Sequence, residues 1–324
     1  MGGYATMNKR ERMFAAIEGR TPDHVPAVFS LHFPRECAFG QKAVDAHKEF
    51  YEKVDCDALK IMNEHLLPPI GKINSPDDWN RIKAFTRNDY VLADQIDLVK
   101  RILDTVKPEY SIATIHGVCA SVIHPIEQTY GYVESRKVMC STLRENKEVM
   151  LDAHKRATEI MCELARACVE AGVDGIYYAA LGGENHFYTD EEFEESIKPF
   201  DLEIMKAAKE AGAHVYLHIC KEDLNMKRYK DYAPLSDVVN WGVYEAPMSL
   251  DEGRKLFPGC TIMGGLANRS GVIVQGDEQK ITDEVQSIIK KFGENKFILG
   301  ADCTLPTEIP YKSIAAAVKA TVIK

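Results

Sequence analysis

Residues 296–303 read KFILGADC, a short apolar run that ends in an acid and a thiol. The run follows a segment in which Ile281, Val285 and Phe292 share one helical face, and Gly293 ends that pattern. The same order, an amphipathic helix followed by a short apolar strand, recurs along the chain. Because repeated strand–helix units place their strands side by side and parallel, we expect an α/β fold built on a parallel sheet.

The apolar runs between the helices number eight, and most are rich in β-branched or aromatic residues. Eight strand–helix units predict a closed (β/α)8 TIM barrel, with residues 1–324 forming a single domain. The long segment before the third strand, residues 68–107, predicts an elaborated insertion of loop and helices on the barrel rim. The expected strands are Val25–Leu31, Ala58–Met62, Tyr110–His116, Gly175–Leu181, His214–Cys220, Val238–Glu245, Thr261–Ala267 and Lys296–Ala301.

An open, doubly wound sheet is the alternative arrangement of such units. That fold would be expected to place a glycine-rich turn after the first strand, where this chain has SLHFP at residues 30–34. The remaining helical patterns fit either arrangement, and they begin near Lys147, after Pro199 and near Tyr311. The missing glycine-rich turn favours the barrel.

The composition narrows the class of protein. The formal net charge of −9 argues against a nucleic-acid surface, which needs clustered lysine and arginine. No apolar run is long enough to cross a bilayer, and no secretory signal is evident, so we expect a cytoplasmic protein without a membrane partner. The nine cysteines then indicate a reducing compartment rather than a disulfide framework.

Polar and metal-binding residue types gather where the expected strands end. In a TIM barrel the carboxyl ends of the strands carry the active site, so these positions are the candidates for function. Half or more of the ten histidines lie at or just after a strand end, which a random distribution would not produce. The strand-end residues are His32, Asn63, Glu64, His65, His116, Glu184, His186, His218, Cys220, Glu245, Asn268, Arg269, Asp302 and Cys303.

His218, Cys220 and Cys303 form the strongest of these candidates. Residues two apart in a strand face the same side, so His218 and Cys220 can reach one point, and Cys303 follows another strand. One imidazole and two thiolates are ligands that zinc prefers, and three protein ligands leave a position open for a substrate. Glu245 is the candidate for a labile fourth ligand. The competing interpretation is that these cysteines only pack, as we expect for the other seven.

The other strand-end residues allow more than one role. Glu184 is a candidate catalytic base or substrate-binding residue, and it could instead cap the next helix. Asp302 is a candidate catalytic residue that orients His218, with a helix cap as the alternative. Four residues are expected to bind a cofactor, although each histidine among them could be an ordinary hydrogen-bonded loop residue: His32, Asn63, His116 and Asn268.

Several stretches resemble the uroporphyrinogen decarboxylase superfamily over nearly the whole chain. Residues 7–13 and 22–26 are similar to its opening helix and first strand. Residues 264–268, GGLAN, are similar to the Gly-Asn-Leu-type turn of the family, and residues 297–303 followed by Pro306 are similar to its closing segment. Within the superfamily, the chain most resembles the cobamide-dependent methyltransferases.

Two departures from family patterns refine this resemblance. True uroporphyrinogen decarboxylases carry Arg-Gln-Ala-Gly-Arg after the first strand, where this chain has LHFPRE at residues 31–36, so decarboxylation of a porphyrinogen is not expected. His218, Cys220 and Cys303 match the His-x-Cys and distant Cys that bind zinc in methylcobamide:thiol methyltransferases. Residues 221–223, KED, replace the glycine that usually follows, which leaves the identity of the methyl acceptor open.

The resemblance implies a zinc-dependent enzyme that moves a methyl group between a methylated corrinoid protein and a small-molecule thiol. Zn²⁺ would keep the thiol ionised, and methylcobamide would act as co-substrate on the partner protein. The chain contains no Asp-x-His-x-x-Gly corrinoid motif, which is why a partner is expected. Three alternatives remain: transfer from a methyl ether or amine to a corrinoid protein, a metal-free decarboxylase-like enzyme, and a non-catalytic zinc- or corrinoid-binding protein.

Overall fold

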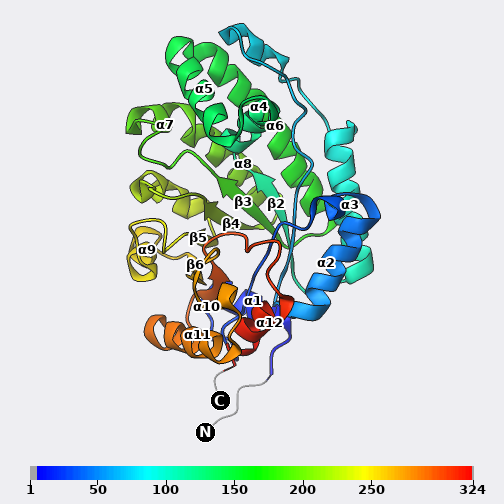
Figure 1. Ribbon diagram of the computed structural model, residues 1–324, viewed down its shortest axis with the longest axis vertical. Helices are drawn as coiled ribbons and strands as arrows, with labels where there is room; N and C mark the ends of the chain where they lie inside the picture. The colour runs from blue at the N-terminus through cyan, green and yellow to red at the C-terminus, as the bar shows by residue number, and fades with distance from the viewer. Residues whose placement is uncertain (1–5, 323–324) are drawn as a thin grey trace.

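A seven-stranded parallel sheet forms the centre of the molecule in the computed structural model, which describes residues 6–322. Each strand pairs with the next one in sequence, the arrangement of a TIM-like α/β barrel, and helices surround the strands (Figure 1). The strands are β1 Leu59–Ile61, β2 Ser111–His116, β3 Gly175–Ala180, β4 His214–Ile219, β5 Val238–Trp241, β6 Thr261–Leu266 and β7 Phe297–Ala301.

The first expected strand, Val25–Leu31, is not a regular strand within residues 6–322. It makes only isolated parallel bridges, one of which pairs Ala27 with Leu299 of β7. Pro26 has no backbone N–H, and the Ala27 N–H donates to the Asp57 carboxylate at 2.7 Å rather than to a neighbouring strand. The segment still lies between β7 and β1, because Asp57 N donates to the Ala27 carbonyl at 3.0 Å.

The expected helices are confirmed where capping residues and glycines marked their ends most clearly. The longest helix, α6, begins after Asn146, whose side chain accepts from Val149 N at 3.3 Å, and it ends at Gly172 with φ of 110°. The helices are α1 Lys9–Glu18, α2 Gly40–Val54, α3 Tyr90–Val106, α4 Val118–Tyr130, α5 Tyr132–Glu145, α6 Lys147–Ala171, α7 Asp190–Ser196, α8 Lys198–Glu210, α9 Leu250–Leu256, α10 Gly271–Gln275, α11 Glu278–Phe292 and α12 Tyr311–Lys319, with 3-10 turns at Arg35–Cys37, Pro76–Arg81 and Met226–Leu235.

The expected insertion before the third predicted strand contains the 3-10 turn Pro76–Arg81 and helix α3. Helix α3 is also the connecting helix between β1 and β2. The connection from β2 to β3 is more elaborate, because it contains α4, α5 and α6 in succession. No helix within residues 6–322 combines the length and apolar character needed to span a membrane.

Aromatic side chains fill the amino-terminal end of the barrel. The Tyr216 hydroxyl donates to the Tyr110 hydroxyl at 3.1 Å, and Tyr110 lies 2.7 Å from His214 Nδ1. Phe14 from helix α1 packs edge-on against Tyr110 and His214. This packing fills the barrel at the end opposite the carboxyl ends of the strands, where the candidate residues lie.

Candidate metal centre

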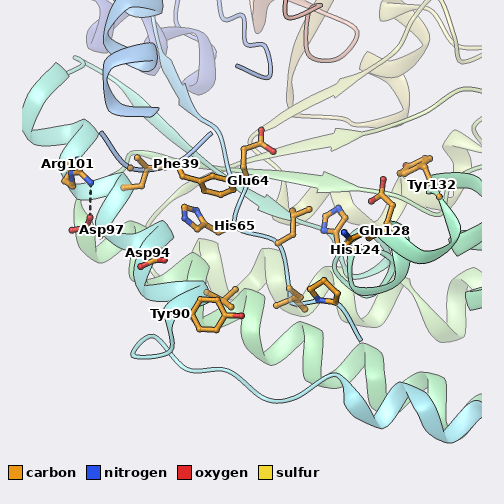
Figure 2. A pocket seen from close by; sticks show the side chains of 18 residues that line it. Phe39, Glu64, His65, Tyr90, Asp94, Asp97, Arg101, His124, Gln128 and Tyr132 are labelled. Carbon is orange, nitrogen blue, oxygen red and sulfur yellow. Dashed lines mark ion pairs between the residues drawn. The ribbon is translucent and has the colours of Figure 1, made fainter. Parts of the chain in front are cut away.

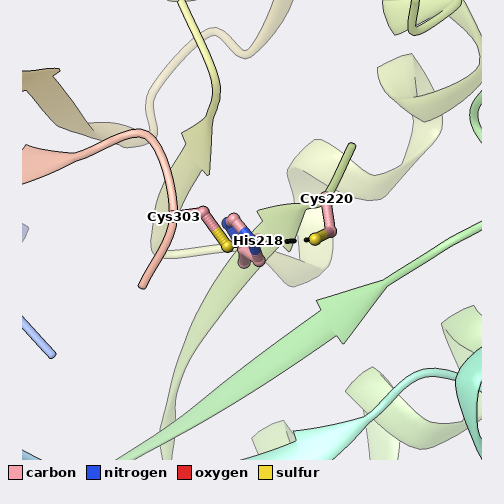
Figure 3. Close-up of side chains that lie close together, drawn as sticks. All are labelled: His218, Cys220 and Cys303. Atoms are coloured by element: carbon pink, nitrogen blue, oxygen red, sulfur yellow. Dashed lines mark hydrogen bonds between the residues drawn. The ribbon is translucent and has the colours of Figure 1, made fainter. Parts of the chain in front are cut away.

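His218, Cys220 and Cys303 converge at the carboxyl end of the barrel (Figure 3). His218 lies in β4, Cys220 directly follows that strand, and Cys303 follows β7. Their ligand atoms all lie within 4.8 Å of one another, and the two sulfur atoms are 3.9 Å apart. Because β4 and β7 are not neighbours in the sheet, only closure of the barrel brings these side chains together.

Asn240 in β5 fixes the orientation and the tautomer of His218. The Asn240 amide nitrogen donates to the carbonyls of Met263 and Ala301, at 2.9 and 3.1 Å, so its oxygen must face the imidazole. That oxygen lies 2.6 Å from His218 Nδ1, which must therefore be the protonated nitrogen. The lone pair of His218 consequently sits on Nε2.

The donor set fits a zinc ion. His218 Nε2 is buried and has no hydrogen-bond partner, an arrangement that is rare unless something else satisfies the lone pair. Cys220 and Cys303 are only half-buried, so the group keeps one open side. One nitrogen and two sulfur donors suit zinc, and no other group of three such residues occurs within residues 6–322.

A buried lysine interacts electrostatically with the two thiols. Cys220 and Cys303 share one thiol–thiol contact, which holds the pKa of Cys303 well below its ordinary value and raises the pKa of Cys220. Lys60 lies within the barrel, where burial lowers its pKa to about 8 although both cysteines oppose that shift. Its ammonium group lies 3.7 Å from the centre of the Tyr177 ring, and that ring stacks on His218 at 5.2 Å.

Asp302 holds a turn and makes no contact with His218. Its carboxylate accepts from the backbone N–H groups of Val243 and Tyr244, both at 3.1 Å, and burial raises its pKa to about 7. Glu245 lies in the same turn and is exposed, because β5 ends at Trp241 and not at Glu245 as expected. Glu245 lies outside the group of three ligand residues. Asn240 therefore has the orienting role that the sequence suggested for Asp302.

Glu184 is buried in an ion pair with Arg136. Its second oxygen accepts from Gly182 N at 3.2 Å, and the Arg136 guanidinium packs over the Phe187 ring at 4.1 Å. A carboxylate held in this way stabilises the loop after β3. It does not belong to the group formed by the three ligand residues.

Two of the residues expected to bind a cofactor are buried amides that brace loops. Asn63 donates to the Thr114 carbonyl at 3.3 Å, and Asn268 donates to the Thr304 carbonyl at 3.2 Å. Both sit at the carboxyl end of the barrel, as expected. Their donor groups are engaged by the protein itself.

The other two residues expected to bind a cofactor are histidines, one following the first expected strand and one ending β2. His32 is exposed, and its Nδ1 lies 2.6 Å from the Glu64 carboxylate. His116 ends β2 and packs edge-on against His124 at 4.8 Å. Burial, followed by the neighbouring His124, lowers the pKa of His116 to about 3, so this ring is neutral at physiological pH.

A cavity of about 900 Å³ is lined in part by His124, the ring that packs against His116 (Figure 2). Its walls come from the start of α2, the loop after β1, helix α3 and the end of α4. Tyr132 on its wall lies under the Lys221 ammonium, 4.5 Å from the ring centre, and Lys221 adjoins Cys220. The Tyr132 ring therefore links the cavity wall to the residue that follows Cys220.

Three residues at this centre were not among those expected from the sequence: Asn240, Lys60 and Tyr177. Each is a polar side chain inside a short strand whose neighbours are apolar, as in VVNW at residues 238–241. A buried polar residue in such a run must find a partner, and that is the signal that could have identified these residues. Their partners come from other strands, so the sequence alone does not name them.

Comparisons with known proteins agree with this architecture. A sequence model of the uroporphyrinogen decarboxylase (URO-D) family matches residues 61–322. A methyltransferase from Methanosarcina mazei has a similar structure, with a TM-score of 0.75 and 18% identity over 97% of this chain and 98% of that one. A B12-independent methionine synthase from Shewanella sp. W3-18-1, in complex with selenomethionine, aligns with a TM-score of 0.58 and 12% identity over 92% and 96% of the two chains. Curated protein sequences gave no significant match.

Proposed function

The chain belongs to the uroporphyrinogen decarboxylase family, and from this membership and the convergence of His218, Cys220 and Cys303 we propose that it is a zinc-dependent corrinoid methyltransferase. It moves a methyl group between a methylated corrinoid protein and a small-molecule thiol. The observation that carries the proposal is the buried, unpartnered His218 Nε2 facing two half-buried sulfur atoms. The similar protein from Methanosarcina mazei is a methyltransferase, which supports the same reaction class.

The residues of the chain have distinct tasks in this proposal. His218, Cys220 and Cys303 would hold Zn²⁺, and Asn240 keeps His218 in the tautomer that a metal requires. When bound, the ion would supply Lewis acidity that keeps a substrate thiol ionised at neutral pH. Lys60 places positive charge behind the thiolates, which offsets the negative charge of an additional sulfur ligand.

Glu245 is the proposed fourth oxygen ligand in the absence of substrate. Partial desolvation of this exposed side chain raises the pKa of its carboxyl, and the charge of Cys303 raises it further, so the two groups interact electrostatically. Its exposed position in the turn after β5 would let the carboxylate withdraw when a thiol enters.

Transfer from a methyl ether or amine to a corrinoid protein is the second candidate function. The observation that favours it is the cavity of about 900 Å³, which is larger than a simple thiol needs. In both reactions the corrinoid protein is a proposed partner that would approach the open end of the barrel, because the chain has no corrinoid motif of its own.

Zinc analysis tests the proposal directly. Protein purified without added metal should contain about one zinc per chain, the stoichiometry of a three-ligand catalytic site. Cys220→Ala and Cys303→Ala should both lose zinc and methyl transfer to thiols, whereas Cys37→Ala should lose neither. Cys37 is the matched control because it is the remaining half-buried thiol. A wild-type protein that takes up no zinc on reconstitution, or a zinc-free variant that still methylates thiols, would refute the proposal.

A further inference from the structure

The cavity of about 900 Å³ has exposed aromatic walls (Figure 2). Phe39 and Tyr90 line it and are 51% and 63% exposed, values far above those of the aromatic rings in the core. Tyr132 forms another part of the wall. Large rings exposed together in a concave site are typical of surfaces that a ligand covers.

The same cavity carries two carboxylates without partners. Asp94 in α3 and Glu127 in α4 line it, and neither forms a hydrogen bond or ion pair through its side chain within residues 6–322. Glu64, a third carboxylate on the wall, is held by His32 at 2.6 Å. Unpaired carboxylates on the wall of one cavity leave negative charge that a bound cation would offset.

No free positive charge of the described cavity wall balances these carboxylates. Arg101 is its only arginine or lysine, and it already pairs with Asp97 at 3.5 Å and donates to Gln41 at 2.7 Å. His124 is also on the wall, and burial lowers its pKa to about 4, so it is neutral. Its Nδ1 atom is buried and has no hydrogen-bond partner. Among the residues that line the cavity, negative charge therefore exceeds available positive charge, and one further cation, Lys221, lies over the Tyr132 ring.

We propose that this cavity binds a small organic cation, namely an ammonium group carrying alkyl substituents. Aromatic faces attract such cations through their quadrupole, and the two unpartnered carboxylates supply the countercharge. One wall ring already shows this behaviour, since the Lys221 ammonium lies 4.5 Å from the centre of the Tyr132 ring. An anionic ligand of the same size would meet repulsion from Asp94 and Glu127.

The position of the cavity assigns a role to this cation. Tyr132 connects its wall to Lys221, which adjoins the proposed zinc ligand Cys220. A ligand that contacts Tyr132 would therefore be separated from Cys220 by Lys221. As a substrate, the cation would be the amine that gives up a methyl group, an assignment that rests on the second candidate function proposed above, whereas binding of the cation does not.

Choline and its neutral isostere 3,3-dimethylbutan-1-ol provide the test, with binding to the full chain measured by titration calorimetry. Choline should bind at least about tenfold more tightly than the neutral alcohol. Asp94→Asn and Glu127→Gln should each weaken choline binding by about two- to fivefold, and Tyr90→Leu by about three- to tenfold. None of these changes should alter the affinity for the neutral alcohol by more than about twofold, apart from Tyr90→Leu, which removes apolar wall.

Asp104→Asn is the matched control, because Asp104 is an exposed acid of the same helix α3 that does not line the cavity. It should bind choline like the wild type. Equal affinity for choline and the alcohol, tighter binding of the anion 3,3-dimethylbutanoate, or an unchanged affinity in the double variant Asp94→Asn/Glu127→Gln would overturn the inference. Calorimetry on zinc-loaded and zinc-free protein separates the two proposals. If the protein binds choline but takes up no zinc, the cavity proposal holds without the zinc proposal. If it takes up zinc but does not bind choline, only the cavity proposal is refuted.

Discussion

Replacing Asn240 with alanine should weaken zinc binding by about 10- to 100-fold, or about 1.4–2.7 kcal/mol. The Asn240 oxygen accepts from His218 Nδ1 at 2.6 Å and from the Tyr177 hydroxyl at 3.1 Å. Alanine removes both interactions, so the imidazole loses the partner that fixes its tautomer and orientation. The lost amide also leaves the carbonyls of Met263 and Ala301 without a donor, and the folded state should lose about 3–5 kcal/mol.

The Asn240→Asp variant separates the effect on His218 orientation from the effect on folding stability. A carboxylate still accepts from His218 Nδ1 and Tyr177, but it cannot donate to the two carbonyls that the amide now satisfies. We therefore expect zinc affinity within about threefold of the wild type, because carboxylates commonly orient metal-binding histidines. The stability of the zinc-free protein should fall about as much as in the alanine variant, since a buried charge then faces two carbonyl oxygens.

Two measurements give these quantities independently. Competition with a chromophoric chelator measures zinc affinity, and urea unfolding of zinc-free protein measures stability. The absorption spectrum of the cobalt-substituted protein should keep its thiolate bands in the aspartate variant and change in the alanine variant. Equal losses of zinc affinity in both variants, or wild-type affinity in the alanine variant, would show that Asn240 does not position His218.

Three further predictions concern the thiol pair, the buried ion pair and pH. Mild oxidation of zinc-free protein with diamide should link Cys220 to Cys303, whose sulfur atoms are 3.9 Å apart; intact mass should show the loss of two hydrogens, and bound zinc should prevent it. Arg136→Met should cost about 3–5 kcal/mol in urea unfolding, because Glu184 is left buried and charged, and adding Glu184→Gln should restore most of this loss. Burial lowers the pKa of His154 in the folded protein to about 4. The neutral imidazole therefore contributes fully to the free energy of unfolding above about pH 6.5. That contribution falls by up to about 3 kcal/mol as the pH drops toward 4. His154→Leu should therefore have a shallower decline in unfolding free energy over that range; parallel pH profiles would contradict this.

The periodic spacing of apolar residues predicted most of the fold. It could do so because the buried face of each helix or strand is set by residues that are close together in the sequence. The amphipathic stripe of α6 and the glycine that ends it follow from residues close in sequence, and the structure has them where expected. Seven of the expected strands are present for the same reason. The exception, Val25–Leu31, is equally apolar, but Pro26 and the distant Asp57 reduce its pairing to isolated bridges. Only the effect of Pro26 could be predicted from residues nearby in the sequence.

The ligand candidates could be identified from the sequence alone. Alternation along a strand puts His218 and Cys220 on one side, and the carboxyl ends of barrel strands lie together, which puts Cys303 at the same end. The groups that surround these ligands could not, because they depend on how the strands and loops pack. Asn240 reaches His218 from the neighbouring strand, whereas Asp302 is drawn into the turn after β5. Hydrogen bonds depend on distances of a few tenths of an ångström between residues far apart in the chain, and that information exists only once the barrel has closed.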